Sequence, residues 1–186
     1  MMVLERELNM QAEAKHEQTE SALLKRQVRV LLALFIIGLV LSGVTAIPLV
    51  GEVAFLNKVV GEGSATQTWW PSLAAWISRI YRGVMEASGQ YPFLLYGTDW
   101  LAFGHIVIAI SFLGPLRDPV RNIWVIEFGM IACILVIPWA LIFGPIRGIP
   151  FFWRLIDCSF GVIGIIPLVL AWRYTRRIIG GSSIHV

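Results

Sequence analysis

The chain has 186 residues, of which 57% are hydrophobic and only 15% are charged. This composition, with a mean hydropathy of +0.74, excludes a soluble multi-domain protein and predicts a polytopic membrane protein. The formal net charge of +3 comes from basic residues beside apolar runs, where Lys and Arg anchor helices at lipid headgroups, so we expect no nucleic-acid partner.

The hydropathy pattern predicts an all-α integral membrane protein. A membrane-spanning helix needs about 20 apolar residues, and this chain contains four such runs. We expect a four-helix transmembrane bundle with an amphipathic interfacial helix between the first and second spans. The predicted transmembrane domain covers residues 30–177, with spans at about residues 30–50, 97–114, 122–144 and 152–173.

An N-terminal segment, residues 1–29, precedes the first span and contains no Gly or Pro. We expect a cytoplasmic tail there, either solvated or helical and continuous with the span. The basic residues Lys25, Arg26 and Arg29 adjoin the apolar run, which is the cytoplasmic pattern. The polar lead favours an uncleaved membrane anchor over a signal peptide.

Small residues mark one face of the first span. Gly38, Ser42 and Thr45 recur at helical spacing. Because small side chains let helices approach closely in lipid, we expect this face to pack against a neighbouring helix.

Residues 51–96 form the longest polar excursion and are expected to be extracytoplasmic. They contain a loop at residues 61–66, followed by an amphipathic helix that begins near Pro71. Its apolar face carries Leu73, Trp76, Ile77, Ile80, Tyr81 and Val84, and its polar face carries Ser78, Arg79, Arg82 and Glu86. We expect an interfacial helix with its aromatic side chains at headgroup level. The alternative is a lid that packs over the mouth of the bundle.

Basic residues between and after the spans predict the orientation. They flank the tight turn at residues 114–119 and the end of the fourth span: Arg117, Arg121, Arg173, Arg176 and Arg177. Four alternating spans place these residues on the same side as the N-terminal basic cluster, and that side is cytoplasmic by the positive-inside rule. We therefore expect both termini, including a tail at residues 178–186, on the cytoplasmic side of a bacterial-type inner membrane.

Several ionisable residues are expected to gather in the outer half of the membrane. Such side chains are costly in hydrocarbon and usually face a partner or a wet cavity. Asp99 lies near the outer end of the second span, and His105 lies roughly 9 Å deeper at about 1.5 Å per residue. The loop before the fourth span and the span itself add Arg147, Arg154 and Asp157. With Trp100 and Trp153 at the same outer level, these residues form the predicted ligand-binding site.

Each ionisable residue also has a simpler possible role. Arg154 and Asp157 are three residues apart on one helix and are able to form a structural ion pair. Asp99 is placed to cap its helix. His105 is too deep for a cap, so it is either a hydrogen-bonded packing residue or a proton carrier or ligand.

Glu127 stands apart from this cluster, near the inner end of the third span. We expect its carboxylate to pair with Arg121 or to extend toward the cytoplasm. The alternative interpretation makes Glu127 the inner station of a proton relay that also uses His105.

Motifs for catalysis and cofactors are absent from the sequence. The chain contains no GxSxG, HExxH, P-loop or Rossmann glycine pattern. Its His, Asp and Cys residues have no spacing that is diagnostic of a metal site, and the cofactor stays unknown. The two cysteines, Cys133 and Cys158, lie in different apolar runs and predict no disulfide framework.

The leading hypothesis is a protein that binds a small amphipathic molecule, such as a lipid or a quinone, in an outward-facing polar pocket roofed by the amphipathic helix. One alternative is a proton-coupled small-molecule carrier that acts as a dimer. Another is a structural or assembly subunit of a membrane complex. An enzyme is the least favoured class because the sequence indicates no nucleophile. The expected partners are membrane lipids, with a homodimer or a larger membrane complex as the assembly.

Overall fold

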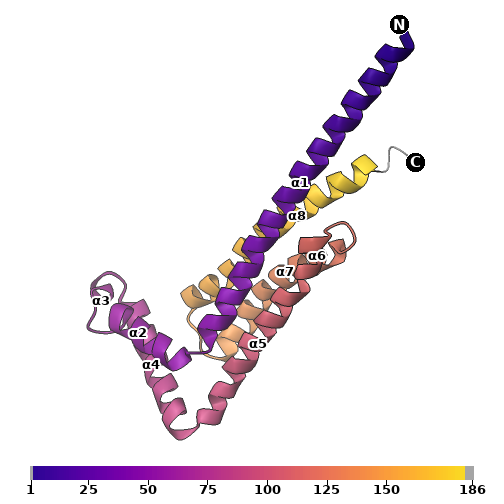
Figure 1. Cartoon of the computed structure of the whole chain (residues 1–186). Helices are drawn as coiled ribbons and strands as arrows, with labels where there is room; N and C mark the ends of the chain where they lie inside the picture. Colours follow the sequence, from indigo (N-terminus) through magenta and orange to yellow (C-terminus); the bar gives the residue numbers. More distant parts are fainter. Residues whose placement is uncertain (1, 183–186) are drawn as a thin grey trace. The chain divides into compact units, whose positions relative to one another are not determined.

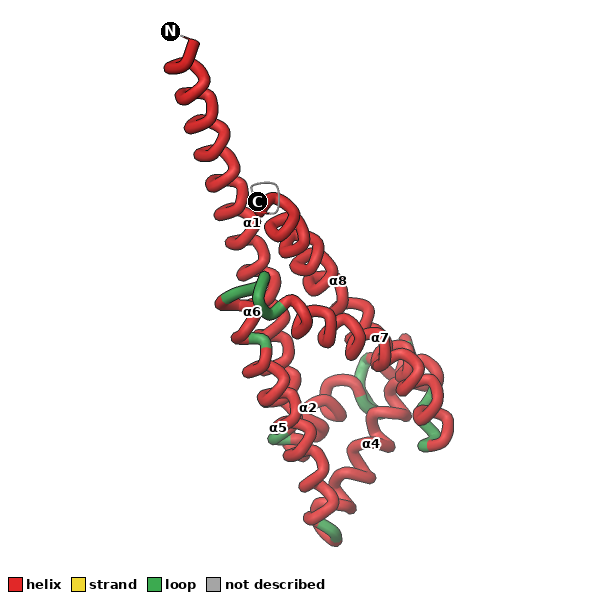
Figure 2. The backbone as a smooth tube through the Cα atoms, turned by 90° about the vertical axis from the view of Figure 1, so that its right-hand side faces the viewer, coloured by secondary structure: helices red, strands yellow, loops and turns green. Residues whose placement is uncertain are grey.

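A computed structural model describes residues 2–182 of the chain (Figure 1). These residues form helices joined by short connections and contain no strand (Figure 2). In chain order the helices are α1 (Met2–Ala46), α2 (Leu49–Val60), α3 (Thr66–Trp69), α4 (Pro71–Gln90), the 3₁₀ helix η1 (Pro92–Leu95), α5 (Tyr96–Ser111), α6 (Leu113–Arg117), α7 (Ile123–Ile146) and α8 (Phe151–Ser182).

Four helical segments are long and apolar enough to cross a membrane, which confirms the all-helical, four-segment part of the prediction. They are Gln18–Ala46, Pro92–Arg117, Ile123–Ile146 and Phe151–Gly181. Each contains most of one of the predicted spans. The described chain is therefore an all-helical protein with the segments of a helical membrane protein.

The first of these segments ends earlier than the predicted boundary at residue 50. Helix α1 runs without interruption from Met2 to Ala46, and α2 begins at Leu49. Pro48 separates them. Proline has no N–H to donate and disfavours helical geometry in the residue before it, so the apolar run is divided at this point.

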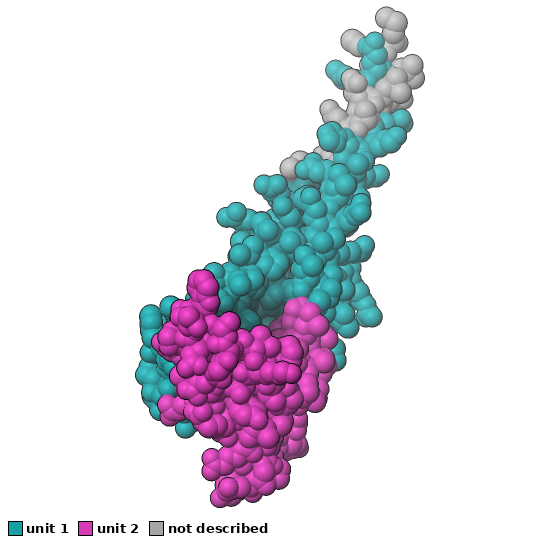
Figure 3. All heavy atoms as spheres, turned by 90° about the vertical axis from the view of Figure 1, so that its left-hand side faces the viewer, with its two compact units in different colours: residues 1–37, 110–186 teal, residues 38–109 magenta. Residues whose placement is uncertain are grey.

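The chain divides into two compact units, which Figure 3 shows in two colours. Unit 1 comprises Met1–Ile37 and Ile110–Val186, and unit 2 comprises Gly38–Ala109. Unit 1 thus contains α6, α7, α8 and most of α1. Unit 2 contains α2, α3, α4, η1 and most of α5.

In unit 1, α7 and α8 lie side by side along their lengths (Figure 1). Small residues permit this close packing, because a Cβ on Gly161 would overlap the carbonyl oxygen of Cys133. The ring of Phe112 packs against Gly129 and lies 4.8 Å from the ring of Phe35. The side chains that are fully buried in this unit include Leu32, Phe112, Ile126 and Leu168.

In unit 2, α2 and α4 form a helical hairpin. The prediction contained no helix at Leu49–Val60. Val53 of α2 and Ala74 and Ile77 of α4 are buried, so the apolar sides of the two helices cover each other. The contact between the helices explains why α2 forms although its own sequence carries Gly and charged residues.

The predicted polar face of α4 is wrong at one residue, Ser78. It was expected to face solvent, but it is only 4% exposed. Its hydroxyl donates to Oδ1 of Asn57 at 2.7 Å and accepts the backbone N–H of Glu62 at 2.8 Å. Glu62 also forms an exposed ion pair with Arg82 at 3.2 Å. These bonds join α2, the loop after it and α4, so the burial of a hydroxyl is compensated.

The small-residue face of the first span is also corrected. Gly38, Ser42 and Thr45 are exposed, and a Cβ on Gly38 would have nothing within 4 Å. The packed small residue in unit 2 is Gly43, where a Cβ would lie 2.9 Å from Cβ of His105 and 3.0 Å from the carbonyl oxygen of Ala102. The end of α1 therefore approaches α5 at Gly43.

Candidate binding pocket

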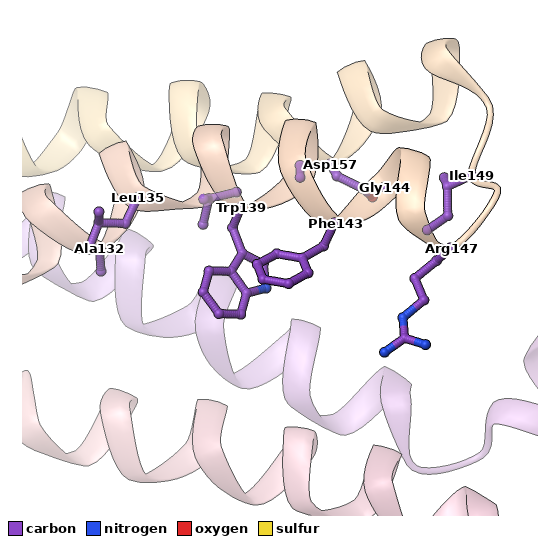
Figure 4. A pocket seen from close by; sticks show the side chains of 10 residues that line it. Ala132, Leu135, Trp139, Phe143, Gly144, Arg147, Ile149 and Asp157 are labelled. Carbon is purple, nitrogen blue, oxygen red and sulfur yellow. The ribbon is translucent and has the colours of Figure 1, made fainter.

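Unit 1 contains a pocket of about 580 Å³ along one side of α7 (Figure 4). This volume falls in the range of small-molecule sites. The lining comes from α7, from the connection after it and from one residue of α8. It consists of Ala132, Leu135, Val136, Trp139, Ala140, Phe143, Gly144, Arg147, Ile149 and Asp157.

Helical spacing explains how α7 builds this wall. Leu135, Trp139, Phe143 and Arg147 follow one another at intervals of four residues, so they lie along one face. The rings of Trp139 and Phe143 have their centroids 4.4 Å apart. Both rings project to the same side of the helix as the guanidinium of Arg147 (Figure 4). The face is therefore apolar along its length and positive at its end.

Arg147 directly follows the end of α7. Its backbone N–H donates to the carbonyl oxygens of Phe143 and Gly144 at 3.1 and 3.2 Å, so the backbone is held while the side chain is exposed. The next residue, Gly148, has a φ of +68°, a conformation that glycine adopts without steric cost. This turn brings the chain to the start of α8 and places Ile149 in the pocket lining.

Arg154 lies next to the pocket on α8. Its side chain packs against Gly144, where a Cβ would overlap its Cγ and Cδ, and its guanidinium lies 5.1 Å from the centre of the Phe151 ring. Its Nε is buried and has no hydrogen-bond partner. Gly144 is thus the residue that admits this arginine beside α7.

The ion pair expected between Arg154 and Asp157 does not form in the described structure. Side chains on a helix lean toward its N-terminus, and the contact with Phe151 follows that direction. An arginine that precedes its acid by three residues therefore turns away from it. The favourable order on a helix is the reverse, with the acid before the base.

Asp99 and Trp100 lie on the first part of α5 in unit 2, and both are exposed. Asp99 is an acidic residue in the first helical turn, where it stabilises the positive end of the helix. The ring of Trp100 makes edge contacts with Tyr96 at 5.9 Å and with Phe103 at 5.4 Å between centroids. Asp99 thus has a position that suits a helix start, and Trp100 belongs to a row of aromatic side chains.

His105 is half-buried in unit 2 and forms a local hydrogen bond. Its Nδ1 lies 2.8 Å from the carbonyl oxygen of Leu101, one helical turn earlier. Because that oxygen only accepts, the neutral ring carries its proton on Nδ1. The bond and the contact with Gly43 fix the ring, and they fit the packing alternative that the sequence left open.

Glu127 has a partner that the sequence did not indicate. Its Oε1 accepts a hydrogen bond from the indole N–H of Trp172 at 2.9 Å, which joins α7 to α8. The guanidinium of Arg176 lies 5.3 Å from the centre of the same indole ring. The expectation of a pair with Arg121 is not met in the described structure.

The structure therefore brings two of the predicted binding residues, Arg147 and Asp157, into the pocket lining. Arg154 borders the pocket through Gly144, and Trp153 is a half-buried residue of α8. Asp99, Trp100 and His105 belong to unit 2. A single site that combines both groups, and a roof over it formed by α4, draw on both units and stay predictions.

Two pocket residues with large side chains, Trp139 and Phe143, were missed by the sequence analysis. The signal was present in the sequence as two successive intervals of four residues, from Trp139 to Phe143 and from Phe143 to Arg147. The described residues contain no group of three or more His, Cys, Asp or Glu side chains arranged to hold a metal ion. Cys133 and Cys158 are both free thiols and buried.

Comparison with protein-family models, with curated proteins and with solved structures finds no match to this chain. The class of the protein is therefore inferred from its own helices, and a function is proposed from the pocket.

Proposed function

We propose that this chain is an integral membrane protein whose α1, α5, α7 and α8 cross a bacterial-type inner membrane, with both termini in the cytoplasm. The four apolar helical segments support this proposal. The clusters of basic residues before the first segment and at the end of the fourth support the orientation. In this arrangement α4 is an amphipathic helix at the outer membrane surface: Arg79, Arg82 and Glu86 are exposed, while Ile77 is buried.

The proposed function is the binding of a small amphipathic molecule, such as a lipid or a quinone, in the pocket of unit 1. The observation that carries this proposal is the pocket itself. It has a volume of about 580 Å³ and an apolar wall that ends at charged side chains. Ligand sites of this kind combine apolar walls with a few polar groups that fix the orientation of the ligand. No reaction is proposed, because no nucleophile or acid–base pair is placed along this wall.

Native mass spectrometry of the full chain, purified in a neutral detergent, tests the proposal. We expect a co-purifying lipid or quinone adduct on the wild-type protein. Trp139→Ala removes a large part of the wall and should reduce the adduct strongly. Trp124→Ala is the matched control, because Trp124 lies on the same helix with similar exposure, 64% against 68% for Trp139, but outside the pocket.

Equal adducts on both variants would contradict the proposal, because the bound molecule would then lie elsewhere on the protein. A protein without any adduct, even after incubation with added lipid or quinone, would leave the structural-subunit alternative as the better description.

A further inference from the structure

We infer that the molecule bound in the pocket of unit 1 is an acyl-chain lipid with an anionic head, a phosphate or a carboxylate, and that this head binds to Arg147 and Arg154. The inference rests on the proposed binding function and specifies its ligand class. It depends on the charges at one end of the pocket, on the length of the apolar wall and on the place of the arginines in the hairpin formed by α7 and α8.

The end of the pocket near the α7–α8 connection carries an excess of positive charge. Arg147 lines the pocket, and the side chain of Arg154 lies against Gly144, which also lines it. Asp157 is the single acidic side chain in the lining. Neither arginine forms an ion pair with any residue that the structure describes. One lining arginine and one adjacent arginine thus bring two positive charges to this end of the pocket against one carboxylate, and a bound monoanion balances them.

Arg154 is the more unusual of the two cations. Its Nε is buried without an acceptor, and its visible compensation is the contact with the Phe151 ring. Burying part of a guanidinium without an acceptor is unfavourable. An anionic head at the exposed side of the guanidinium offsets this cost, and its oxygens match the planar fork of arginine donors.

The apolar wall has the length of one lipid leaflet. Its α7 residues run from Ala132 to Gly144, which at about 1.5 Å per residue is roughly 18 Å. The hydrocarbon core of a membrane is about 30 Å thick, so one leaflet supplies about 15 Å. An acyl chain that lies along Leu135, Trp139 and Phe143 thus reaches the arginines with its head.

The arginines also lie where lipid heads are found. Arg147 directly follows the end of α7, and Arg154 is in the first turns of α8. In the proposed topology this end of the hairpin lies at the outer membrane surface. Arginine side chains near helix ends reach the headgroup region, so the head and the chain of one lipid fit the two parts of the pocket together.

Native mass spectrometry with two added lipids tests the inference. The probes are phosphatidylglycerol, with a net negative head, and phosphatidylcholine, with a zwitterionic head, and both carry identical acyl chains. We expect the wild-type protein to bind phosphatidylglycerol about tenfold more tightly, the ratio that one charge-assisted contact gives. Arg147→Gln and Arg154→Gln should each reduce this ratio toward one while phosphatidylcholine binding persists. Arg173→Gln, an exposed arginine of α8 outside the pocket, is the control and should keep the ratio.

Other results overturn the inference in distinguishable ways. If the wild-type protein binds both lipids equally and Trp139→Ala weakens both, the proposed function stands and the anionic preference is wrong. If the preference survives in the folded Arg147→Gln variant and in the double variant with Arg154→Gln, the head binds elsewhere. If millimolar inorganic phosphate displaces phosphatidylglycerol completely, the site takes free phosphate rather than a lipid. If lipid binding ignores Trp139, the proposed function fails as well.

Discussion

The indole N–H of Trp172 on α8 donates a hydrogen bond to Oε1 of Glu127 on α7 across 2.9 Å, although the two residues are 45 positions apart in the sequence. This bond joins the two helices in their apolar part, where an unpaired carboxylate is costly. Arg176, one turn after Trp172, packs on the same ring and supplies a nearby positive charge. Glu127 is therefore a component of helix packing in unit 1.

Trp172→Phe should destabilise the protein by about 1–3 kcal/mol, because it leaves the carboxylate of Glu127 without its donor. Glu127→Gln should cost less, since the amide oxygen still accepts the indole N–H. Thermal unfolding of the detergent-solubilised protein measures both, with Trp124→Phe as the control at an exposed site. If Trp172→Phe and Trp124→Phe unfold at the same temperature, the hydrogen bond contributes nothing to stability. Loss of proton flux in Glu127→Gln proteoliposomes with unchanged melting would instead favour the carrier alternative.

Arg154 and Asp157 should behave as independent residues. The structure contains no ion pair between them, so a double-mutant cycle with Arg154→Met and Asp157→Asn should give a coupling free energy below about 0.5 kcal/mol. Arg154→Met alone should leave stability unchanged or raise it, because methionine removes a buried donor that has no partner. A coupling of several kcal/mol, from unfolding of the four proteins, would restore the ion pair expected from the sequence.

Ser78→Ala should destabilise the α2–α4 hairpin by about 1–3 kcal/mol. The change removes one donor and one acceptor from a buried site, and it leaves Asn57 Oδ1 and the N–H of Glu62 without the bonds they now make. Ser72→Ala is the matched control, since Ser72 is an exposed serine on the same helix. Hydrogen exchange at the amide of Glu62 should become faster in Ser78→Ala alone. Unchanged exchange there would show that the loop is held by other contacts.

Gly43→Ala and Gly38→Ala should have opposite effects on stability. Alanine is favoured over glycine in a helix by about 1 kcal/mol, and a Cβ on Gly38 meets nothing within 4 Å. A Cβ on Gly43 would lie 2.9 Å from His105 Cβ and 3.0 Å from Ala102 O, and overpacking typically costs about 1–3 kcal/mol. Melting temperatures above wild type for Gly38→Ala and below it for Gly43→Ala are expected. A gain at both positions would show that α1 and α5 do not pack at Gly43.

The proposed orientation predicts which residues are reached from each side of the membrane. In a background with Cys133 and Cys158 replaced by alanine, Ala65→Cys should react with an impermeant maleimide in intact cells. Gly180→Cys should react only after the membrane is opened. Both positions are exposed in the structure. Labelling of both from the same side would exclude four crossings and the outer location of the pocket's charged end.

Hydropathy was enough to predict the four long helices, because a run of about 20 apolar residues has few other stable forms. It did not predict α2. Most of that segment is apolar, but Pro48 and the residues Gly51, Glu52, Asn57 and Lys58 interrupt the run, so the segment was assigned to the polar excursion. Its helix packs on α4 through the buried Val53 and the Asn57–Ser78 bond. The partner of such a contact, here α4, is not indicated by the sequence of α2 alone.

The sequence predicted only part of the candidate site. Arg147 and Asp157 were identified because charges are rare in apolar runs. Trp139 and Phe143 resemble other span residues until their spacing from Arg147 is considered. The direction of the Arg154 side chain depends on helix geometry and on the space beside Gly144. Neither is evident from the positions of charged residues in the sequence.

The α2–α4 hairpin has a polar joint, which consists of the hydrogen bonds and the ion pair that join α2 and the loop after it to α4. This joint has a consequence for biosynthesis. Its hydrogen bonds and its ion pair all lie between Asn57 and Arg82. A ribosome that makes the chain has thus supplied every group for this joint before it adds the first residue of α5, α7 or α8. Closure of the hairpin therefore requires no residue of the helices that build the pocket, and its assembly does not wait for them.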